Sequence, residues 1–150
     1  MDKFVIRQGN EDYLKSVMTL QLKLAAEDII YGFVPANKEE LQSKLGPYFL
    51  VAELNGSVTG YCYGSVHESE GLVVIPKGEK YLEVDDVYIR PECRDQQVGG
   101  KLLDRLMEIA GMEGVARILI YSASNSKETD KVLQFYRRHG FKSWYVQMFK

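Results

Sequence analysis

Alternating hydrophobic and polar positions divide the first part of the chain into one strand and two helices. Residues 4–8 alternate as a short strand does, and residues 10–28 begin with apolar side chains at helical spacing. Inside that helix the leucines of Leu20–Leu24 alternate with polar residues at a strand period, so the sequence does not decide whether the second half is helix or strand. Residues 37–45 predict a second, short helix, because Asn37 can cap its first turn.

The middle of the chain carries β-type sequence. Residues 48–54 and 58–68 are two β-rich runs, and Asn55–Gly56 between them suits a tight turn with positive φ, so a hairpin is predicted. Glycine and proline mark residues 70–80 as a loop. Residues 81–89 then predict a long strand that ends before a proline.

The last third of the chain alternates between helices and strands. Residues 98–110 place apolar side chains on one helical face, and glycines stop this helix. Residues 116–124 predict a strand, and residues 127–139 predict a helix that Gly140 ends. Residues 141–149 predict a final strand.

This order of elements predicts an α/β fold with a mixed α+β sheet. A hairpin followed by strand–helix–strand units requires antiparallel pairing first and parallel pairing later, because parallel neighbours need a crossover. We therefore expect a central mixed sheet with helices on both faces. The length suits a single domain over residues 1–150, without a repeat or a linker.

Composition and charge narrow the class of protein. Hydrophobic residues make up 45% and charged residues 27% of the chain, which is ordinary soluble usage. With 19 basic and 21 acidic side chains, the net charge of -2 predicts no nucleic-acid partner and only a local anion site. The sequence shows no signal peptide and no apolar span of about 20 residues, so we expect a cytoplasmic protein without a membrane partner. Cys62 and Cys93 stand alone, and the two histidines lack ligand spacing, so no metal site is expected.

The polar stretch after the long strand carries the first chemical signal. Gly99 and Gly100 open the next helix although glycine is a poor helix former. A helix start offers unpaired N–H groups and the positive end of the helix dipole, and glycine lets a phosphate approach closely. With Arg94 and Lys101 nearby, this turn predicts a cradle for a pyrophosphate. It is not a P-loop, because no G-K-S/T sequence follows.

Two segments together resemble one enzyme family. VYIRPECRDQQVGGKLLDRL, residues 87–106, resembles the acetyl-CoA segment of the GNAT N-acetyltransferase superfamily, R/Q-x-x-G-x-G/A after a strand. VLQFYRRHGF, residues 132–141, is similar to the family segment A-x-x-L/F-Y-x-x-x-G-F, at the expected distance. Arg94 and Gly99 match the first and last positions of the first motif, whereas Gln97 stands where the central glycine usually is.

The resemblance implies a GNAT-like fold that binds acetyl-CoA as cosubstrate. The edge of the long strand would face the acetyl group, the glycine turn the pyrophosphate, and a slot beside the following strand the pantetheine arm. The residues that the resemblance assigns to the cosubstrate are Val87, Tyr88, Ile89, Arg94, Asp95, Gln96, Gln97, Val98, Gly99, Gly100, Lys101, Ser124 and Asn125, with Ser122 also beside the slot.

Acetyl transfer needs a proton donor for the thiolate and a proton acceptor for the amine. The resemblance places Tyr136 near the thioester sulfur, and the alternative is that this tyrosine only packs in the core. Glu83 and Asp85 alternate onto one side of the long strand together with Val87 and Ile89. Because burying a charge is costly unless it is paired, each carboxylate is a candidate base or an ion-pair partner. A water relay without a single base is a third possibility.

The function that the resemblance implies is transfer of acetyl from acetyl-CoA to a primary amine of a small molecule, peptide or protein. No cysteine or serine lies in a nucleophile arrangement, which favours direct attack by the amine. Tyr31, Phe33 and acids that include Glu27 predict an apolar acceptor slot with a negative mouth, suited to a cationic amine.

Three questions stay open at this level. The acyl donor could be larger than acetyl-CoA, for example succinyl-CoA. Gln97 and Thr129 depart from the family pattern, which keeps open a degenerate GNAT-fold module that binds an acyl-CoA or a protein without turnover. A homodimer could form if residues 143–149 pair or exchange between copies.

Overall fold

The fold is a five-stranded sheet with helices on both faces. The computed structural model describes residues 3–121 and 127–150. Its elements in chain order are β1 (Phe4–Gln8), the 3-10 turn η1 (Glu11–Tyr13), α1 (Leu14–Glu27), α2 (Lys38–Ser43), β2 (Phe49–Leu54), β3 (Ser57–Glu68), β4 (Lys80–Ile89), the 3-10 turn η2 (Pro91–Cys93), α3 (Val98–Met112), β5 (Arg117–Ile120) and α4 (Thr129–Arg138). No described helix is long and apolar enough to span a bilayer.

The sheet confirms the predicted mixture of strand directions. Its strands lie in the order β1-β2-β3-β4-β5, and each of the first three pairs is antiparallel. Among the described strands, only β4 and β5, which the α3 crossover connects, run parallel. The predicted hairpin turn is present, because Asn55 and Gly56 both adopt positive φ between β2 and β3.

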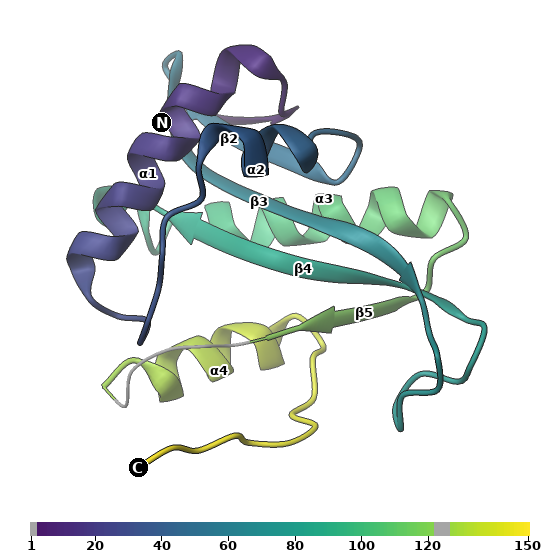
Figure 1. Cartoon of the computed structure of the whole chain (residues 1–150). Helices are drawn as coiled ribbons and strands as arrows, with labels where there is room; N and C mark the ends of the chain where they lie inside the picture. The colour runs from purple at the N-terminus through teal and green to yellow at the C-terminus, as the bar shows by residue number, and fades with distance from the viewer. Residues whose placement is uncertain (1–2, 122–126) are drawn as a thin grey trace.

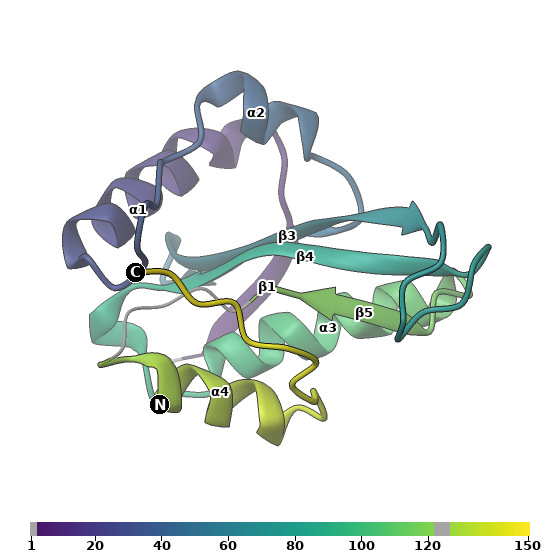
Figure 2. The ribbon, with the colours of Figure 1, turned by 60° about the horizontal axis from the view of Figure 1, so that its bottom comes forward.

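The two faces of the sheet support two separate cores. Helices α1 and α2 cover one face, and α3 and α4 cover the other (Figures 1 and 2). Under α1 the core is built around Phe49, Tyr61 and Tyr63, whose rings stack along the sheet. Under α3 the core is aliphatic, with Leu102 and Leu106 fully buried against β3 and β4.

The structure settles the ambiguous second half of the first helix. Leu20 and Leu24 are buried, whereas Leu22 between them is 62% exposed. Residues four apart lie on the same helical face, so Leu20 and Leu24 share one buried stripe while Leu22 points to solvent. Gln21 is also buried in this stripe, where it has hydrogen-bond partners.

A β-bulge in β4 overturns the predicted alternation of its side chains. Tyr63 pairs with Asp86 and Gly64 pairs with Val84, so Asp85 is an extra residue without a partner on β3. Val87 and Ile89 pack in the aliphatic core under α3, whereas Glu83 and Asp85 contact residues on the opposite face. The prediction that these four residues share one side was therefore wrong, because the bulge reverses the alternation at Asp85.

The predicted final strand is absent. Residues 141–150 form neither strand nor helix, and Val146, Met148 and Phe149 are 71%, 85% and 81% exposed. The apolar pattern alone does not make a strand, because strand formation depends on a neighbour that accepts the backbone hydrogen bonds. Of the predicted strand at 116–124, β5 covers Arg117–Ile120, and residues 122–124 lie outside the described residues.

Candidate active site

A cleft opens where β4 and β5 separate. The two strands pair only over Tyr81–Val84 and Arg117–Ile120, and β4 then continues to Ile89 without β5 beside it. The cleft has a volume of about 680 Å³ and lies between the free end of β4, the loop before α3, and α4. Its lining includes Val87, Ile89, Arg94, Asp95, Gln97, Val98, Gly99, Gly100, Lys101, Val132, Phe135, Tyr136, Arg138 and His139.

The loop before α3 keeps a glycine-like backbone at Gln97. This residue is the N-cap of α3 and has φ 65° and ψ 13°, in the left-handed region. Asp95 also has a positive φ, of 62°. A residue with a side chain pays roughly 1–2 kcal/mol for this conformation, which is why glycine is usual there. Gln97 thus gives the loop the turn that the central motif glycine would provide.

The start of α3 presents free amide groups to the cleft. The N–H groups of residues 96–100 donate no hydrogen bond to the described part of the chain. The first hydrogen bond of α3 is donated by the Lys101 N–H to the Gln97 carbonyl. These groups sit at the positive end of a 15-residue helix, which favours a bound anion. Lys101, Lys131 and Arg138 line the same cleft and add positive charge.

The two glycines of this helix start have different surroundings. A Cβ on Gly99 would lie 3.4 Å from the Phe135 ring, which is an ordinary contact at the wall of the cleft. A Cβ on Gly100 would lie 2.7 Å from Cε1 of His139, which is too close. His139 also contacts Asp104 through Nδ1 at 3.3 Å. Gly100 therefore lets α4 pack tightly against α3.

The Arg94 side chain is held by a carboxylate on α1. Its guanidinium makes two hydrogen bonds to Glu27, of 2.7 and 2.8 Å, and its Nε donates to the carbonyl of Ile89. The Tyr88 hydroxyl donates to the same carboxylate, and the guanidinium lies 5.4 Å from the centre of the Tyr88 ring. Burial opposes ionisation of Glu27, but the bonds from Arg94 and Tyr88 outweigh it and lower its pKa.

This arrangement changes the interpretation of Glu27. The sequence suggested that Glu27 lies at a negative acceptor mouth, yet its charge is neutralised by Arg94. Arg94 and Tyr88 accordingly connect the end of β4 to α1 through their side chains, and Tyr88 belongs to the core under α1. Arg94 still borders the cleft, but its guanidinium is engaged by Glu27.

Tyr136 lines the cleft from α4. Its ring makes edge contacts with Phe135 and Phe141, at centroid distances of 5.2 and 5.8 Å. Burial, with a smaller contribution from the negative charge of Asp86, raises the pKa of Tyr136 to about 12. Its hydroxyl makes no hydrogen bond to another described residue and is fully protonated at neutral pH. The side chain is therefore available as a proton donor.

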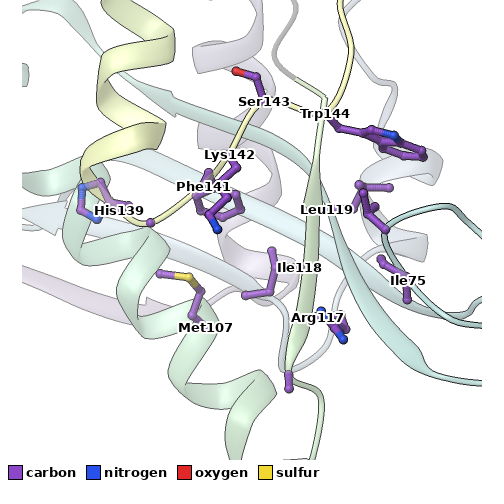
Figure 3. A pocket seen from close by; sticks show the side chains of 13 residues that line it. Ile75, Met107, Arg117, Ile118, Leu119, His139, Phe141, Lys142, Ser143 and Trp144 are labelled. Atoms are coloured by element: carbon purple, nitrogen blue, oxygen red, sulfur yellow. The ribbon is translucent and has the colours of Figure 1, made fainter.

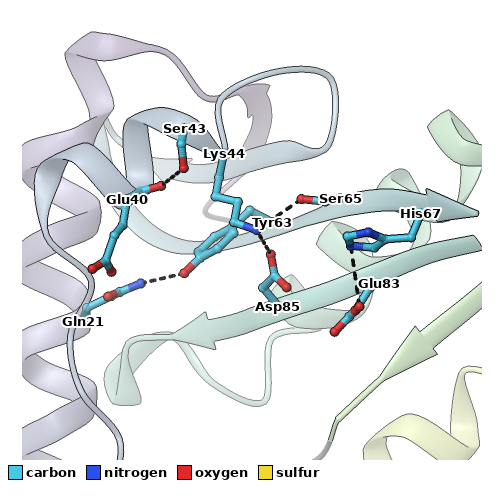
Figure 4. A network of polar contacts seen from close by, with 9 residues as sticks. All are labelled: Gln21, Glu40, Ser43, Lys44, Tyr63, Ser65, His67, Glu83 and Asp85. Carbon is cyan, nitrogen blue, oxygen red and sulfur yellow. Dashed lines mark hydrogen bonds and ion pairs between the residues drawn. The ribbon is translucent and has the colours of Figure 1, made fainter.

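The opposite face of β4 carries a network of charged groups (Figure 4). Asp85 forms an ion pair of 3.0 Å with Lys44, which follows α2, and Lys44 also donates to the Ser65 hydroxyl at 3.3 Å. Glu83 lies 3.6 Å from Nε2 of His67 on β3. Both predicted candidate bases are thus brought together on the face covered by α1 and α2, each with a partner.

Asp86 is the acidic residue that sequence reasoning left out. The Tyr61 hydroxyl donates to its carboxylate at 2.5 Å. Burial raises the pKa of Asp86 to about 6, although the bonds from Tyr61 and from the Val87 backbone oppose the rise. Asp86 lies directly after the bulge, at the point where β4 has left β5. The sequence signal for it was the presence of three carboxylates, Glu83, Asp85 and Asp86, on one otherwise apolar strand.

A buried glutamine connects this region to the loop after α1. Gln21 Nε2 donates to the Tyr63 hydroxyl at 3.2 Å, and Gln21 Oε1 accepts from the Ala36 backbone N–H at 2.6 Å. The loop between α1 and α2 is thereby fixed above the tyrosines of β3.

The comparisons with known proteins agree with this geometry. The model of the acetyltransferase (GNAT) domain matches residues 46–143, which is well over half of the chain. The chain belongs to the GNAT acetyltransferase family. Its matched region begins before β2 and ends after α4, so it includes the strands that separate, the loop before α3, and Tyr136.

Solved GNAT structures share the fold at low sequence identity. A predicted acetyltransferase from Clostridium acetobutylicum, solved with acetyl-CoA, has a TM-score of 0.73 and 15% identity, covering 97% of this chain and 96% of its own. The aminoglycoside N-acetyltransferase AAC(6')-Iy with CoA has a TM-score of 0.71 and 17% identity, covering 100% and 95%. Glucosamine-6-phosphate N-acetyltransferase from Arabidopsis thaliana has a TM-score of 0.70 and 18% identity, covering 99% and 97%. No curated protein matches significantly in sequence.

The structure describes only one side of the predicted slot for the pantetheine arm. Val87 and Ile89 line the cleft from β4, and their role at the cosubstrate stays a prediction. Ser122, Ser124 and Asn125, which were predicted to form the other wall, lie outside the described residues. Among residues 3–121 and 127–150, no three His, Cys, Asp or Glu side chains are grouped as a metal site. Cys62 and Cys93 are both buried free thiols.

Proposed function

We propose that this GNAT protein transfers an acetyl group from acetyl-CoA to a primary amine. The observation that carries the proposal is the cleft itself. It joins amide groups at the start of α3 that have no partner among the described residues to the part of β4 that extends beyond β5, and it reaches Tyr136. A pyrophosphate at the amides and a thioester beside β4 would occupy the two ends of one extended molecule.

The cosubstrate would bind through the backbone more than through the Arg94 side chain. The amides of residues 96–100 would hold the pyrophosphate, and Lys101 on the same helix turn would add positive charge. The edge of Val87–Ile89 would face the pantetheine arm and the acetyl oxygen, because β5 does not occupy it. A backbone N–H there would stabilise the oxyanion of the tetrahedral intermediate.

The acceptor amine would approach from the face covered by α1 and α2. An acceptor that arrives as ammonium first releases one proton to water. The lone pair of the neutral nitrogen then attacks the thioester carbon, the carbon–sulfur bond breaks, and the sulfur leaves as thiolate. Tyr136 would give its proton to that sulfur, since its pKa of about 12 keeps the hydroxyl protonated. The amine nitrogen loses a proton at the same time, and a carboxylate of β4 would accept it.

Asp86 suits the role of proton acceptor better than Glu83 and Asp85 do. Asp85 is paired with Lys44, and Glu83 faces His67 farther from the point where the strands separate. Asp86 is ionised above about pH 6, close to the pH at which a base operates best. Glu83 and Asp85 would then bind the cationic amine on its way to the site, and Glu83 or a water relay is the alternative base.

The first experiment is isothermal titration with acetyl-CoA and with CoA. Wild-type protein is expected to bind both saturably, and Gly99→Glu is expected to weaken both affinities at least tenfold, because its carboxylate would repel the phosphates. Gly111→Glu is the matched control. It makes the same change at the other end of α3, where a Cβ meets nothing within 4 Å, and is expected to bind normally.

A thiol-release assay with small polyamines, amino acids, amino sugars and peptide amino termini then tests turnover. Release of CoA that depends on an amine supports the proposal. Binding of acetyl-CoA without release on any of these amines would favour the degenerate module instead. No binding of either ligand by wild type would contradict the cleft assignment altogether. Repeating the titration with succinyl-CoA determines whether the donor site admits a larger acyl group.

A further inference from the structure

The charged face of β4 is the part of the molecule that can hold a cationic acceptor. A second cavity, of about 580 Å³, lies beside β5 and has largely apolar walls (Figure 3). The ionisable side chains among the described residues that line it are Arg117, His139 and Lys142, so this lining offers a cation no carboxylate. Glu83 and Asp85 lie on the face of β4 that α1 and α2 cover. A cationic acceptor is therefore held on that face.

On this face Asp85 already holds an ammonium group of the chain itself. Lys44 Nζ lies 3.0 Å from the Asp85 carboxylate and donates to the Ser65 hydroxyl at 3.3 Å (Figure 4). Of the nine residues in this network, Lys44 is the only lysine or arginine. The carboxylates of the network are Glu40, Glu83 and Asp85. Alkyl amines are ammonium ions at neutral pH, so Lys44 occupies Asp85 with the chemical group that such an acceptor would bring.

The backbone around Lys44 fixes where its side chain begins. Lys44 ends α2, and its N–H donates to the carbonyls of Leu41 and Gln42. Leu41 is fully buried, and Leu45 packs against the same core under α1. The ammonium group is less firmly held than the backbone, because the Lys44 side chain is 34% exposed and a lysine stem is flexible. It can therefore leave Asp85 without any change in the fold.

Asp85 lies beside the place where the proposed reaction occurs. It is the bulged residue of β4 and directly follows Val84, the last residue of β4 that pairs with β5. Asp86, the proposed proton acceptor, comes next, and Val87 lines the cleft. Two ammonium groups at one carboxylate repel each other, so Lys44 and an acceptor cation compete for Asp85.

We infer that Lys44 is a tethered competitor of the acceptor and thereby sets the affinity for cationic amines. The inference rests on the proposed function, because the acceptor is the one assigned there. An incoming ammonium ion displaces Lys44 from Asp85 before it loses its proton and reacts. An ion pair between partly exposed side chains shifts an equilibrium by a factor of roughly two to five. The KM of the wild type for a cationic acceptor is therefore higher by about this factor than it would be without the Lys44 ammonium group.

Steady-state kinetics with benzylamine, which is cationic at neutral pH, and aniline, which is neutral, test the inference. Lys44→Met keeps a stem of similar length, and it should lower the KM for benzylamine about two- to fivefold with little change in kcat. The KM for aniline should stay the same. Lys44→Arg restores a cation and should keep the KM for benzylamine at or above the wild-type value. The matched control is Lys38→Met at the other end of α2, which should change neither KM.

NMR titration with methylguanidinium in the presence of CoA tests the same competition without acetyl transfer. This cation pairs with carboxylates, as an arginine side chain does, and is not an acetyl acceptor. It should bind Lys44→Met about two- to fivefold more tightly than wild type or Lys38→Met. Equal or weaker binding to Lys44→Met, binding to no variant, or an unchanged KM for benzylamine would overturn the inference. Tighter binding to Lys44→Met without acetylation of any amine would support the competition at Asp85 and contradict the proposed function.

Discussion

Replacing Gly100 by alanine tests whether this glycine is required for the packing of α4 on α3. The added Cβ would lie 2.7 Å from Cε1 and 2.9 Å from Nε2 of His139. The imidazole cannot move freely, because it packs 4.9 Å from the Phe135 ring centre and contacts Asp104. Gly99→Ala is the matched control, since its Cβ meets only ordinary contacts of 3.4 Å or more.

The expected difference follows from two opposing effects. Alanine favours a helix over glycine by up to about 1 kcal/mol, and both variants gain this amount to a similar degree. Only Gly100→Ala pays for overpacking, which costs about 1–3 kcal/mol in a well-packed site. The free energy of unfolding of Gly100→Ala should therefore be lower than that of Gly99→Ala by about 1–3 kcal/mol. The melting temperatures should differ by roughly 2–10 °C.

Urea denaturation followed by circular dichroism measures both variants. The same pair is then made in a His139→Ala background, where the clash is removed and the two stabilities should become equal within about 0.5 kcal/mol. Equal stabilities of Gly100→Ala and Gly99→Ala with His139 present would contradict the inference that α4 packs too closely on α3 to admit a side chain at Gly100.

Three further substitutions test the charged groups and the proposed acid. Asp86→Asn should be more stable than wild type at pH 7 by on the order of 2 kcal/mol. The reason is that the raised pKa of Asp86 makes wild type lose stability as the pH rises from about 4 to about 6. Urea titrations should show this difference in the free energy of unfolding at pH 7 and not at pH 4. Glu27→Gln should cost about 1–3 kcal/mol at pH 7, since it leaves Arg94 without its carboxylate. The lowered pKa of Glu27 makes this loss shrink as the pH falls below about 4, and a loss that is constant with pH would contradict the ion pair. Tyr136→Phe should lower kcat about 10²-fold and leave the Kd for acetyl-CoA nearly unchanged; an unchanged kcat would remove Tyr136 as the proton donor.

The order of elements could be predicted from the sequence because it depends on local periodicity. The hairpin at Asn55, the helix after Gly99 and the parallel crossover all follow from patterns within about 20 residues. The register of β3 against β4 does not, since one extra residue at Asp85 shifts every later side chain to the other face. That shift is why Asp86 was overlooked as the partner of Tyr61.

The loop before α3 illustrates the difference between residue type and backbone conformation. The glycine motif predicted the place of the cleft, although Gln97 breaks the pattern. The structure keeps the turn because Gln97 adopts a positive φ at a modest energetic cost. A motif that specifies residue types cannot predict this backbone conformation. The pairing of Arg94 with Glu27 was equally out of reach, since the two are 67 residues apart.

The bulge at Asp85 also concentrates charge. By placing Glu83, Asp85 and Asp86 on one face of β4, it gathers three acids opposite Lys44 and His67, in a chain whose total charge is only -2. A local negative field of this kind attracts cations before contact and speeds their association. The rate at which a cationic acceptor reaches the site should therefore fall as salt is added, while the rate for a neutral amine of the same size should not. We therefore propose that the residue inserted at Asp85 makes this face favour cationic over neutral acceptors through their rate of association.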